Sequence, residues 1–328
     1  MSKGFAFKKV VLMPPNWLGD VILAQPALRT LCLQYQDAEI SVFGRGWLKE
    51  LLPFLNLEHE YVRYVDTLPQ KADAVFLFPN SFRSAWQAWR SGARQRIGFR
   101  KDGRSLLLTH GYTPRIDLIT QHHLLYYLDL LQQYGLDTPL KEVELNAPEV
   151  AHQRAEALLS SQGLDVAKVI CVAPGAQFGG AKRYPAESYA VVLKALSAQG
   201  WHIVVLGTEA ERDIAAQCLK DVQGKHWNAA GETSLSQALS LVSVAQLMLC
   251  NDSGLMHVAA GLGIPTVTMF GATNPDRTSP SGKKVQVLYE PARCSPCLQR
   301  ECSVQGHPCM MNILPEYVIA ACERFLRA

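Results

Sequence analysis

The sequence predicts an α/β protein with two domains, each built on a doubly wound parallel sheet. Two observations carry this prediction. Short apolar runs alternate with helical stretches along the chain, which is typical of parallel strands joined by helices. The 328 residues make about two domains of common size, and the second half repeats the plan of the first. We therefore expect two Rossmann-like domains whose carboxyl-end loops face each other across a ligand-binding cleft.

The individual elements follow in order along both halves. Apolar runs predict strands at 9–13, 40–43, 74–78, 169–173, 202–206, 246–250 and 266–270. Helical patterns lie at about 20–35, 149–162, 185–199, from 209 onward, and 235–244. Because a fresh strand follows the polar helix at 149–162, we expect a first domain of residues 1–160 and a second of 161–328. The last helix, about 315–328, is a candidate to pack back on the first domain.

The composition excludes several classes of protein. A net charge of +3 is too small for a general nucleic-acid binder. The first apolar run stops at Pro14, so we expect no secretory signal. No apolar stretch approaches the roughly 20 residues of a membrane span. Nine cysteines without an export signal indicate reduced thiols. We expect a cytoplasmic protein without a transmembrane segment, with contact to a membrane surface left open.

One segment of the chain is strongly basic. Between Arg83 and Arg104 it carries seven arginines and lysines against a single acid, Asp102. A solvated surface is the ordinary explanation of such a run. The aromatic residues Trp86, Trp89 and Phe99 are interleaved with the charges, and they favour an anionic partner instead.

The segment Asn251–His257 has the pattern of a phosphate-binding loop. It follows a buried apolar run and precedes a run of small residues, which predicts a strand, a polar loop and the start of a tightly packed helix. The N–H groups and the dipole of such a helix attract an anion. The alternative is that Asp252 or Ser253 only caps the helix.

A second loop, Pro174–Lys182, ends in a lysine at the start of a predicted helix. Its glycine spacing fits neither a P-loop nor the dinucleotide fingerprint, which disfavours both classes. Since this loop and the Asp252 loop follow strands of one sheet, they can converge on a diphosphate, as in a nucleotide or nucleotide-sugar site. In the first half, Asp20 lies where a strand-end loop meets a helix. It is a candidate general base, or else a capping or first-turn acid.

Four motifs, in this order, resemble the ADP-heptose:lipopolysaccharide heptosyltransferases of glycosyltransferase family 9: Asn16–Asp20, Pro79–Ser84, Pro174–Pro185 and Asn251–Ala260. The resemblance runs from about residue 10 to residue 280 and is strongest to the members that add the second heptose of the inner core. It implies a GT-B fold, and transfer of heptose from ADP-heptose with inversion and without a covalent intermediate.

The resemblance also implies a role for each matching residue. Asp20 would be the general base, and Lys182 would hold the donor phosphates. The other donor-binding residues would be Glu209 at the ribose, Thr233 beside the nucleotide, and Asp252, Ser253, Gly254 and His257 at the phosphates and the heptose. His257 is equally well explained as a packed helix histidine. The acceptor would be heptosyl-Kdo-lipid A at the inner face of the inner membrane; its anionic groups suit arginines. The acceptor-binding candidates are Asn80, Ser81, Arg83, Arg94 and Arg96.

The resemblance requires no cofactor, and the chain has no Asp-x-Asp motif, which fits transfer without a catalytic metal. A cysteine cluster departs from the best-known members: Cys294, Cys297, Cys302 and Cys309, with His307 nearby. It is a candidate structural zinc site, with packing of reduced cysteines as the alternative, and we expect it to lie away from the chemistry.

Three alternatives stay open at this point. The first is a heptosyltransferase that adds the first or a later heptose, and the second is a nucleotide-binding protein without transfer activity. The third is a two-domain nucleotide-sugar epimerase, which would need a histidine and acid pair and would act on the donor alone.

Overall fold

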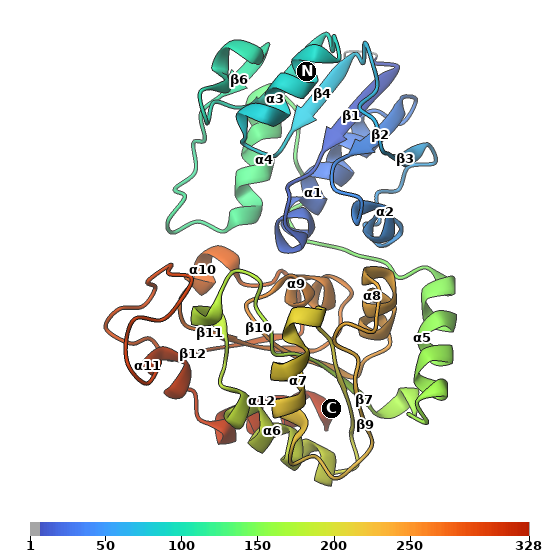
Figure 1. Cartoon of the computed structure of the whole chain (residues 1–328). Helices are drawn as coiled ribbons and strands as arrows, with labels where there is room; N and C mark the ends of the chain where they lie inside the picture. Colours follow the sequence, from blue (N-terminus) through green and yellow to red (C-terminus); the bar gives the residue numbers. More distant parts are fainter. Residues whose placement is uncertain (1–6, 328) are drawn as a thin grey trace. The chain divides into compact units, whose positions relative to one another are not determined.

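The computed structural model describes residues 7–327, which form two compact units (Figure 1). Unit 1 ends at Asn146 and unit 2 begins at Ala147. Each unit contains one sheet of six parallel strands with helices packed on it. The predicted fold class, two doubly wound parallel sheets in tandem, is confirmed.

The strand order of unit 1 is β3-β2-β1-β4-β5-β6. This order reverses direction between β1 and β4, which is the place where ligands bind in open α/β sheets. The elements of the unit are β1 (Lys9–Met13), α1 (Leu18–Gln34), β2 (Glu39–Phe43), α2 (Leu48–Leu51), η1 (Leu52–Phe54), β3 (Val62–Val65), β4 (Ala74–Leu77), α3 (Phe82–Arg90), β5 (Gln95–Phe99), η2 (Arg104–Leu107), β6 (His110–Tyr112) and α4 (His123–Tyr134).

Helices α1 and α3 cover opposite faces of the first sheet. Helix α1 joins β1 to β2 in one direction, whereas α3 joins β4 to β5 in the other. Because such crossovers are right-handed, the two helices lie on opposite faces. Helix α4 packs on α1, whereas α3 packs on β4, β5 and η2.

Unit 2 repeats this arrangement with the strand order β12-β11-β10-β7-β8-β9, which reverses between β7 and β10. Its elements are α5 (Glu149–Ser161), η3 (Val166–Lys168), β7 (Val169–Ala173), η4 (Gly180–Lys182), α6 (Ala186–Ala198), β8 (His202–Val205), η5 (Glu209–Glu211), α7 (Arg212–Leu219), β9 (His226–Asn228), α8 (Leu235–Ser243), β10 (Leu247–Asn251), α9 (Gly254–Gly261), β11 (Thr266–Phe270), α10 (Pro275–Thr278), β12 (Val285–Tyr289), α11 (Pro308–Met311) and α12 (Pro315–Leu326).

One expectation about the division of the chain is corrected. We placed the boundary at 160/161, but the chain divides between Asn146 and Ala147, because α5 packs on α8 and so belongs to unit 2. Helix α12 packs on α6, β10 and β11 of its own unit, where Val318 and Cys322 are fully buried. That the last helix also packs back on the first domain stays a prediction.

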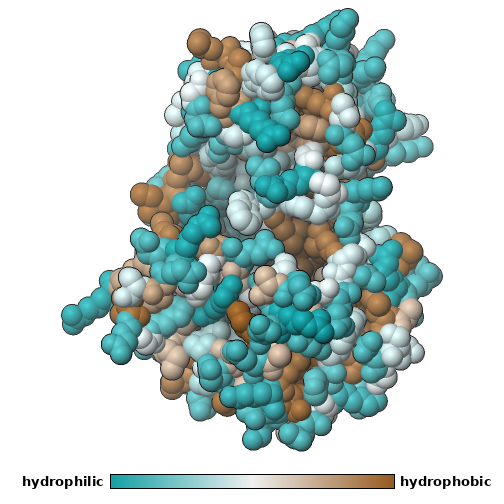
Figure 2. All heavy atoms as spheres, in the orientation of Figure 1, coloured by the Kyte–Doolittle hydropathy of each residue, from teal (hydrophilic) through white to brown (hydrophobic). Residues whose placement is uncertain are grey.

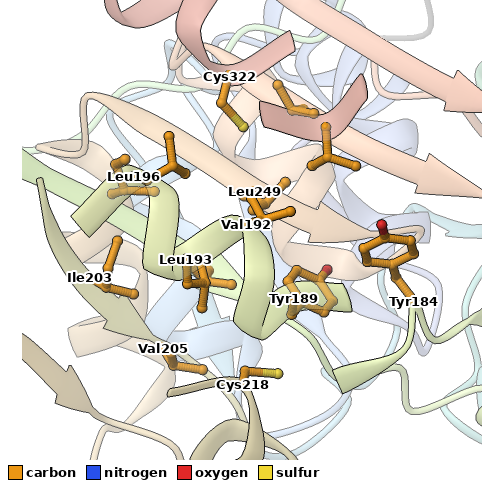
Figure 3. Close-up of a cluster of buried hydrophobic side chains, with 14 of the residues drawn as sticks. Tyr184, Tyr189, Val192, Leu193, Leu196, Ile203, Val205, Cys218, Leu249 and Cys322 are labelled. Carbon is orange, nitrogen blue, oxygen red and sulfur yellow. The ribbon is translucent and has the colours of Figure 1, made fainter. Parts of the chain in front are cut away.

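A core cluster of unit 2 lies between the sheet, α6 and α12 (Figure 3). Tyr184 and Tyr189 stand at one side of this cluster, and Leu193 and Leu196 extend it along α6. Burial raises the pKa of Tyr184 to about 12, so the phenol stays neutral at physiological pH. Both tyrosines carry hydroxyl groups that must find partners in the core, and one of these partners belongs to the site described next.

The visible surface is mixed, with hydrophilic side chains predominating and hydrophobic ones scattered between them (Figure 2). Within residues 7–327, we find no helix with the length and apolar character needed to cross a membrane.

Candidate active site

The sequence-predicted residues gather at the carboxyl ends of the strands in each unit. In unit 1, Asp20 and Asn80 follow β1 and β4, the two strands at which the order reverses. In unit 2, Lys182 and Asp252 follow β7 and β10, which occupy the equivalent positions. Each pair therefore lies at the place where doubly wound sheets bind ligands.

Lys182 and Asp252 form an ion pair in unit 2. The Nζ of Lys182 lies 2.6 Å from Oδ2 of Asp252, and the two side chains are only 14% and 6% exposed. The same oxygen accepts a hydrogen bond of 2.7 Å from the Thr273 hydroxyl. The ammonium group also lies 4.9 Å from the ring centre of Phe178. The positive charge of Lys182 is thus fixed beside the end of β10 by Asp252 and Phe178, and Thr273 in turn holds Asp252.

The N-terminus of α9 follows directly. Ser253 is the N-cap residue, but no side chain caps this helix. The Ser253 Oγ is buried and has no hydrogen-bond partner within the described part of the chain. Ser253 thus occupies the N-cap position without capping the helix through its side chain. The first N–H groups of a helix lack partners inside the helix, so the α9 start, from Gly254, offers donors and a positive dipole to an anion.

Asn251 joins the two loops of this site. The side chain is fully buried, and its Oδ1 accepts hydrogen bonds of 3.0 Å from the Tyr184 N–H and from the Tyr189 hydroxyl. Its Nδ2 donates to the carbonyl oxygen of Pro174 at 2.6 Å. The end of β10 is thereby tied to the loop after β7 and to the start of α6. His257, 5% exposed, lies further along α9 and belongs to the packed part of the helix.

The loop that carries Lys182 rests on the cysteine-rich segment. Ala181 donates its N–H to the Arg300 carbonyl at 2.9 Å, and the His307 ring nitrogen Nε2 lies 3.0 Å from the Ala181 carbonyl. Gly179 has a φ of 153°, and a Cβ there would lie 2.1 Å from the Arg300 carbonyl oxygen. The expectation that the cysteine segment lies away from the chemistry is therefore wrong, because it supports the Lys182 loop.

A structural zinc site is not formed by the predicted residues. Across residues 7–327, no group of three or more histidine, cysteine, aspartate or glutamate side chains is arranged to hold a metal ion. Cys309 is buried, Cys297 and Cys302 are half-buried, and Cys294 is exposed. Burial, with the nearby cysteines adding to it, raises the pKa of the Cys309 thiol. All four are free thiols, and of the four Cys309 alone is packed in the interior.

The two remaining donor candidates extend the same edge of the sheet. Glu209 is exposed at the start of η5 after β8, and its carboxylate lies against Gly231. Thr233 is half-buried and lies after β9, just before α8. Strands lie about 4.8 Å apart, so the row from β10 through β7 and β8 to β9 spans roughly 15 Å. An elongated ligand can run along this edge from the anion site toward Thr233.

In unit 1, Asp20 is a first-turn residue of α1, whose N-cap is Trp17. Its side chain is 37% exposed, and its Oδ1 lies 3.9 Å from Nε2 of His123 at the start of α4. His123 stacks on Tyr126, with ring centres 5.3 Å apart and planes 7° apart. Its Nε2 also lies 3.1 Å from the Tyr127 hydroxyl. A solvent-accessible carboxylate thus faces an imidazole held by two tyrosines.

The loop Pro79–Ser81 lies next to this group because Arg104 holds it. Arg104 is fully buried and donates hydrogen bonds to the carbonyl oxygen of Pro79 and to the Ser84 hydroxyl. Burial lowers its pKa to about 10, an effect that Tyr126 and Asp102 partly offset, and the guanidinium stays charged at neutral pH. Asn80 Oδ1 accepts a hydrogen bond of 3.0 Å from the Tyr126 hydroxyl. Tyr126 therefore connects the Asn80 loop to His123 and Asp20.

The structure separates the acceptor candidates into two groups. Asn80, Ser81 and Arg83 lie at the carboxyl edge of the sheet, the edge of Asp20. Arg94 and Arg96 lie at the amino end of β5, on the opposite edge. Arg94 pairs with Asp73 at 3.3 Å, and Arg96 donates to the Leu107 and Ala93 carbonyl oxygens. This placement does not support an acceptor role for Arg94 or Arg96.

Several residues of the candidate site were missed in the sequence. His123, Tyr126 and Thr273 lie in no recognisable motif, and only the contacts of the folded chain reveal them. Arg104 belongs to the basic run, but its burial could not be inferred from charge alone. The same holds for Phe99, which was counted among the aromatic groups facing a partner and is in fact buried in β5.

The chain is similar to known transferases over most of its length. The sequence model for Glycosyltransferase family 9 (heptosyltransferase) matches residues 62–307. Lipopolysaccharide heptosyltransferase 2 of Escherichia coli is 30% identical, over 95% of this chain and 96% of the relative. The structure of E. coli ADP-heptose LPS heptosyltransferase II superimposes with a TM-score of 0.80 and 27% identity, over 97% of this chain and 98% of that one. A glycosyltransferase of family 9 from Veillonella parvula gives a TM-score of 0.83 at 24% identity, over 99% of both chains.

Proposed function

We propose that this chain transfers L-glycero-D-manno-heptose from ADP-heptose. The premise is that the chain belongs to glycosyltransferase family 9 and is a glycosyltransferase. The proposed acceptor is the first heptose of the Kdo-lipid A inner core. The observation that carries the donor assignment is the Lys182–Asp252 pair beside the uncapped N-terminus of α9. The acceptor assignment is supported by the relative at 30% identity, which is named lipopolysaccharide heptosyltransferase 2.

The donor is held along the carboxyl edge of the second sheet. The Lys182 ammonium and the first N–H groups of α9 receive the diphosphate, and the dipole of α9 adds to the field. Asp252 holds Lys182 in place, and Ser253 Oγ and the Gly254 N–H donate to the phosphate or to the heptose. The nucleoside runs along the carboxyl-end edge of the second sheet toward Glu209 and Thr233. Glu209 receives the ribose hydroxyls. His257 supports the loop from inside α9.

Asp20 acts as the general base on the acceptor. Its carboxylate takes the proton from the attacking hydroxyl, a new bond forms between that oxygen and the anomeric carbon, and the bond from this carbon to the β-phosphate oxygen breaks. ADP leaves with the negative charge that Lys182 and α9 stabilise. A single displacement of this kind inverts the anomeric configuration, and the proton bound by Asp20 passes to solvent.

Residues of unit 1 bind the acceptor. Asn80 and Ser81 offer polar groups next to the Asp20 network, and Arg83 offers an exposed guanidinium suited to carboxylates and phosphates. Unit 1 is accordingly the acceptor-binding domain and unit 2 the donor-binding domain. The protein acts in the cytoplasm at the inner face of the inner membrane, where the lipid-linked acceptor is accessible to it.

The proposal is tested by transfer assays with two matched acceptors. Purified protein is incubated with ADP-heptose and either Kdo-lipid A or heptosyl-Kdo-lipid A, and the products are identified by mass. We expect one heptose to be added to heptosyl-Kdo-lipid A only. Transfer to Kdo-lipid A would assign the first transfer instead. Conversion of ADP-heptose without any acceptor would indicate an epimerase, and ADP-heptose binding without turnover on either acceptor would indicate a binding protein.

A further inference from the structure

Helix α3 exposes its aromatic residues to solvent. Phe82, Trp86 and Trp89 are spaced by four and three residues, so they form one stripe along the helix. Their exposed fractions are 47%, 40% and 52%. Such large aromatic side chains are usually buried in soluble proteins. The aromatic stripe, as we call these three residues, is therefore a feature that folding alone does not explain.

The opposite side of α3 explains why the stripe faces outward. The helix contacts the sheet through Ala85 and Ala88, both fully buried. With these small residues beneath it, α3 packs on β4 and β5 without using its large side chains. Next to α3 lies η2, on which Leu106 is 97% exposed. Figure 2 shows hydrophobic side chains exposed on unit 1 in the region of β6, which follows η2 in the chain.

Basic residues predominate around the stripe. Helix α3 carries Arg83 and Arg90 and no acidic residue, and Lys101 is exposed in the loop that follows β5. The guanidinium carbon of Arg90 lies 4.9 Å from the centre of the Trp86 ring. The one acid of this segment, Asp102, accepts the Phe82 N–H at 2.7 Å and so caps α3. One exposed acid, Asp66, lines the same groove as Trp86 and Arg90.

We infer that the aromatic stripe, with Leu106 and the flanking arginines, docks unit 1 on an anionic lipid bilayer. Tryptophan and phenylalanine partition into the interfacial region of membranes, and arginines gain attraction to acidic headgroups. A helix with aromatic and basic groups on its outer side has the chemistry of an interfacial helix lying in the membrane plane. The inference deepens the proposed function and rests on it in one respect, since the acceptor proposed there is embedded in such a bilayer.

The stripe is tested by vesicle co-sedimentation. The full-length protein is mixed with vesicles of phosphatidylethanolamine and phosphatidylglycerol, or with neutral phosphatidylcholine vesicles as control. We expect binding to the anionic vesicles only. This binding should weaken when salt is raised to about 0.5 M, where charges are screened within a few Å.

Trp86→Ala/Trp89→Ala should lower the partition coefficient at least tenfold, and Leu106→Ser should lower it by a smaller factor. Tyr61→Ala, which removes a 60% exposed aromatic residue from the same unit, should bind like the wild type. Thermal unfolding of each variant checks that the fold is kept.

Transfer assays separate this inference from the proposed function. We expect Trp86→Ala/Trp89→Ala to keep its rate on detergent-dispersed acceptor and to lose at least tenfold on acceptor embedded in vesicles. The inference would be overturned if the wild-type protein stayed unbound in the anionic vesicle sample. It would also be overturned if the wild type formed a concentration-dependent dimer that the double variant abolishes, because the stripe would then bind a second copy of the chain. An equal loss on dispersed acceptor would also overturn it. If the wild type binds vesicles but transfers no heptose, the proposed function fails and the docking surface stands.

Discussion

Lys182 and Asp252 meet at 2.6 Å where the strand order of unit 2 reverses, and both side chains are largely shielded from solvent. A shielded ion pair contributes little net stability, yet removing one partner leaves the other charge uncompensated. The pair therefore holds a positive charge in a fixed position beside the N-terminus of α9. In the proposed reaction that charge is shared between Asp252 and the diphosphate.

Replacing Lys182 by methionine should lower both stability and donor affinity. Asp252 would lose its cation, so we expect the free energy of unfolding to fall by about 3 kcal/mol, and ADP binding to weaken at least tenfold. Urea denaturation and calorimetric titration with ADP measure the two effects. The double variant Lys182→Met/Asp252→Asn should be more stable than the single one. If the stability losses of the two substitutions simply add, the ion pair is not the reason for the effect.

Asn251→Ala should destabilise unit 2 and disturb the donor loops together. The substitution removes hydrogen bonds to Pro174, Tyr184 and Tyr189 and leaves buried polar groups without partners, which costs about 3 kcal/mol. The same chemical change at the exposed Asn312 serves as the control and should shift the urea midpoint little. Equal midpoints for the two variants would contradict the role assigned to Asn251.

His123 should matter for turnover more than for donor binding. It lies 3.9 Å from Asp20 and is held by Tyr126 and Tyr127. We expect His123→Ala to lower kcat by about tenfold to a hundredfold, at the lower end of general-base effects, and to change the pH profile of kcat. His123→Gln, which can still hydrogen-bond to Tyr127, should recover part of the rate. A change confined to thermal stability, with an unaltered pH profile, would reduce His123 to a packing residue.

Arg83 and Arg94 should differ in their effect on acceptor binding, although both belong to the basic run. Arg83 lies at the edge of the sheet that carries Asp20, whereas Arg94 lies at the opposite edge and pairs with Asp73. Loss of one charge-assisted contact is worth about tenfold in affinity, so Arg83→Ala should raise the acceptor KM by about that factor. Arg94→Ala should leave it unchanged. Steady-state kinetics with acceptor dispersed in detergent measure both KM values. A larger rise in KM for Arg94→Ala than for Arg83→Ala would place the acceptor at the opposite edge of the sheet.

The cysteines should separate into two classes by their reactivity. Burial raises the pKa of Cys32, Cys171 and Cys218 to about 12, so almost no thiolate exists at pH 8. Cys294, Cys297 and Cys302 are exposed or half-buried, and we expect a thiol reagent to label them rapidly in the native protein. Labelling the others should require denaturant. Protection of Cys294, Cys297 and Cys302 that a chelator removes would reinstate the structural zinc.

Most inner strands were predicted from the sequence, whereas the inner strand β5 and the strands at the sheet edges were not. The strands β1, β4, β7, β10 and β11 are apolar runs buried on both faces, and such runs indicate central strands directly. Strands β3, β6 and β12 lie at the sheet edges and are only partly buried. Their mixed composition carries a weaker pattern, and no strand was predicted at these positions.

The site was predictable where it depends on local motifs and not where it depends on long-range contacts. Asp252 and Lys182 lie at loop ends that the strand pattern locates, and their approach follows from the parallel sheet. His123 reaches Asp20 from α4, more than a hundred residues later in the chain. Arg104 appeared as one charge in a basic run, yet it is fully buried under the Asn80 loop. No spacing rule in the sequence distinguishes it from the exposed arginines around it.

The most direct test of the account compares Asp20→Asn with the wild type in two measurements on the same preparation. Calorimetric titration gives the affinity for ADP-heptose, and a transfer assay with heptosyl-Kdo-lipid A gives kcat. The account predicts an unchanged donor affinity, an unchanged unfolding midpoint and a kcat lowered by about 10²- to 10⁴-fold, as expected for loss of a general base. Retained turnover in Asp20→Asn, or loss of donor binding and stability together, would contradict it.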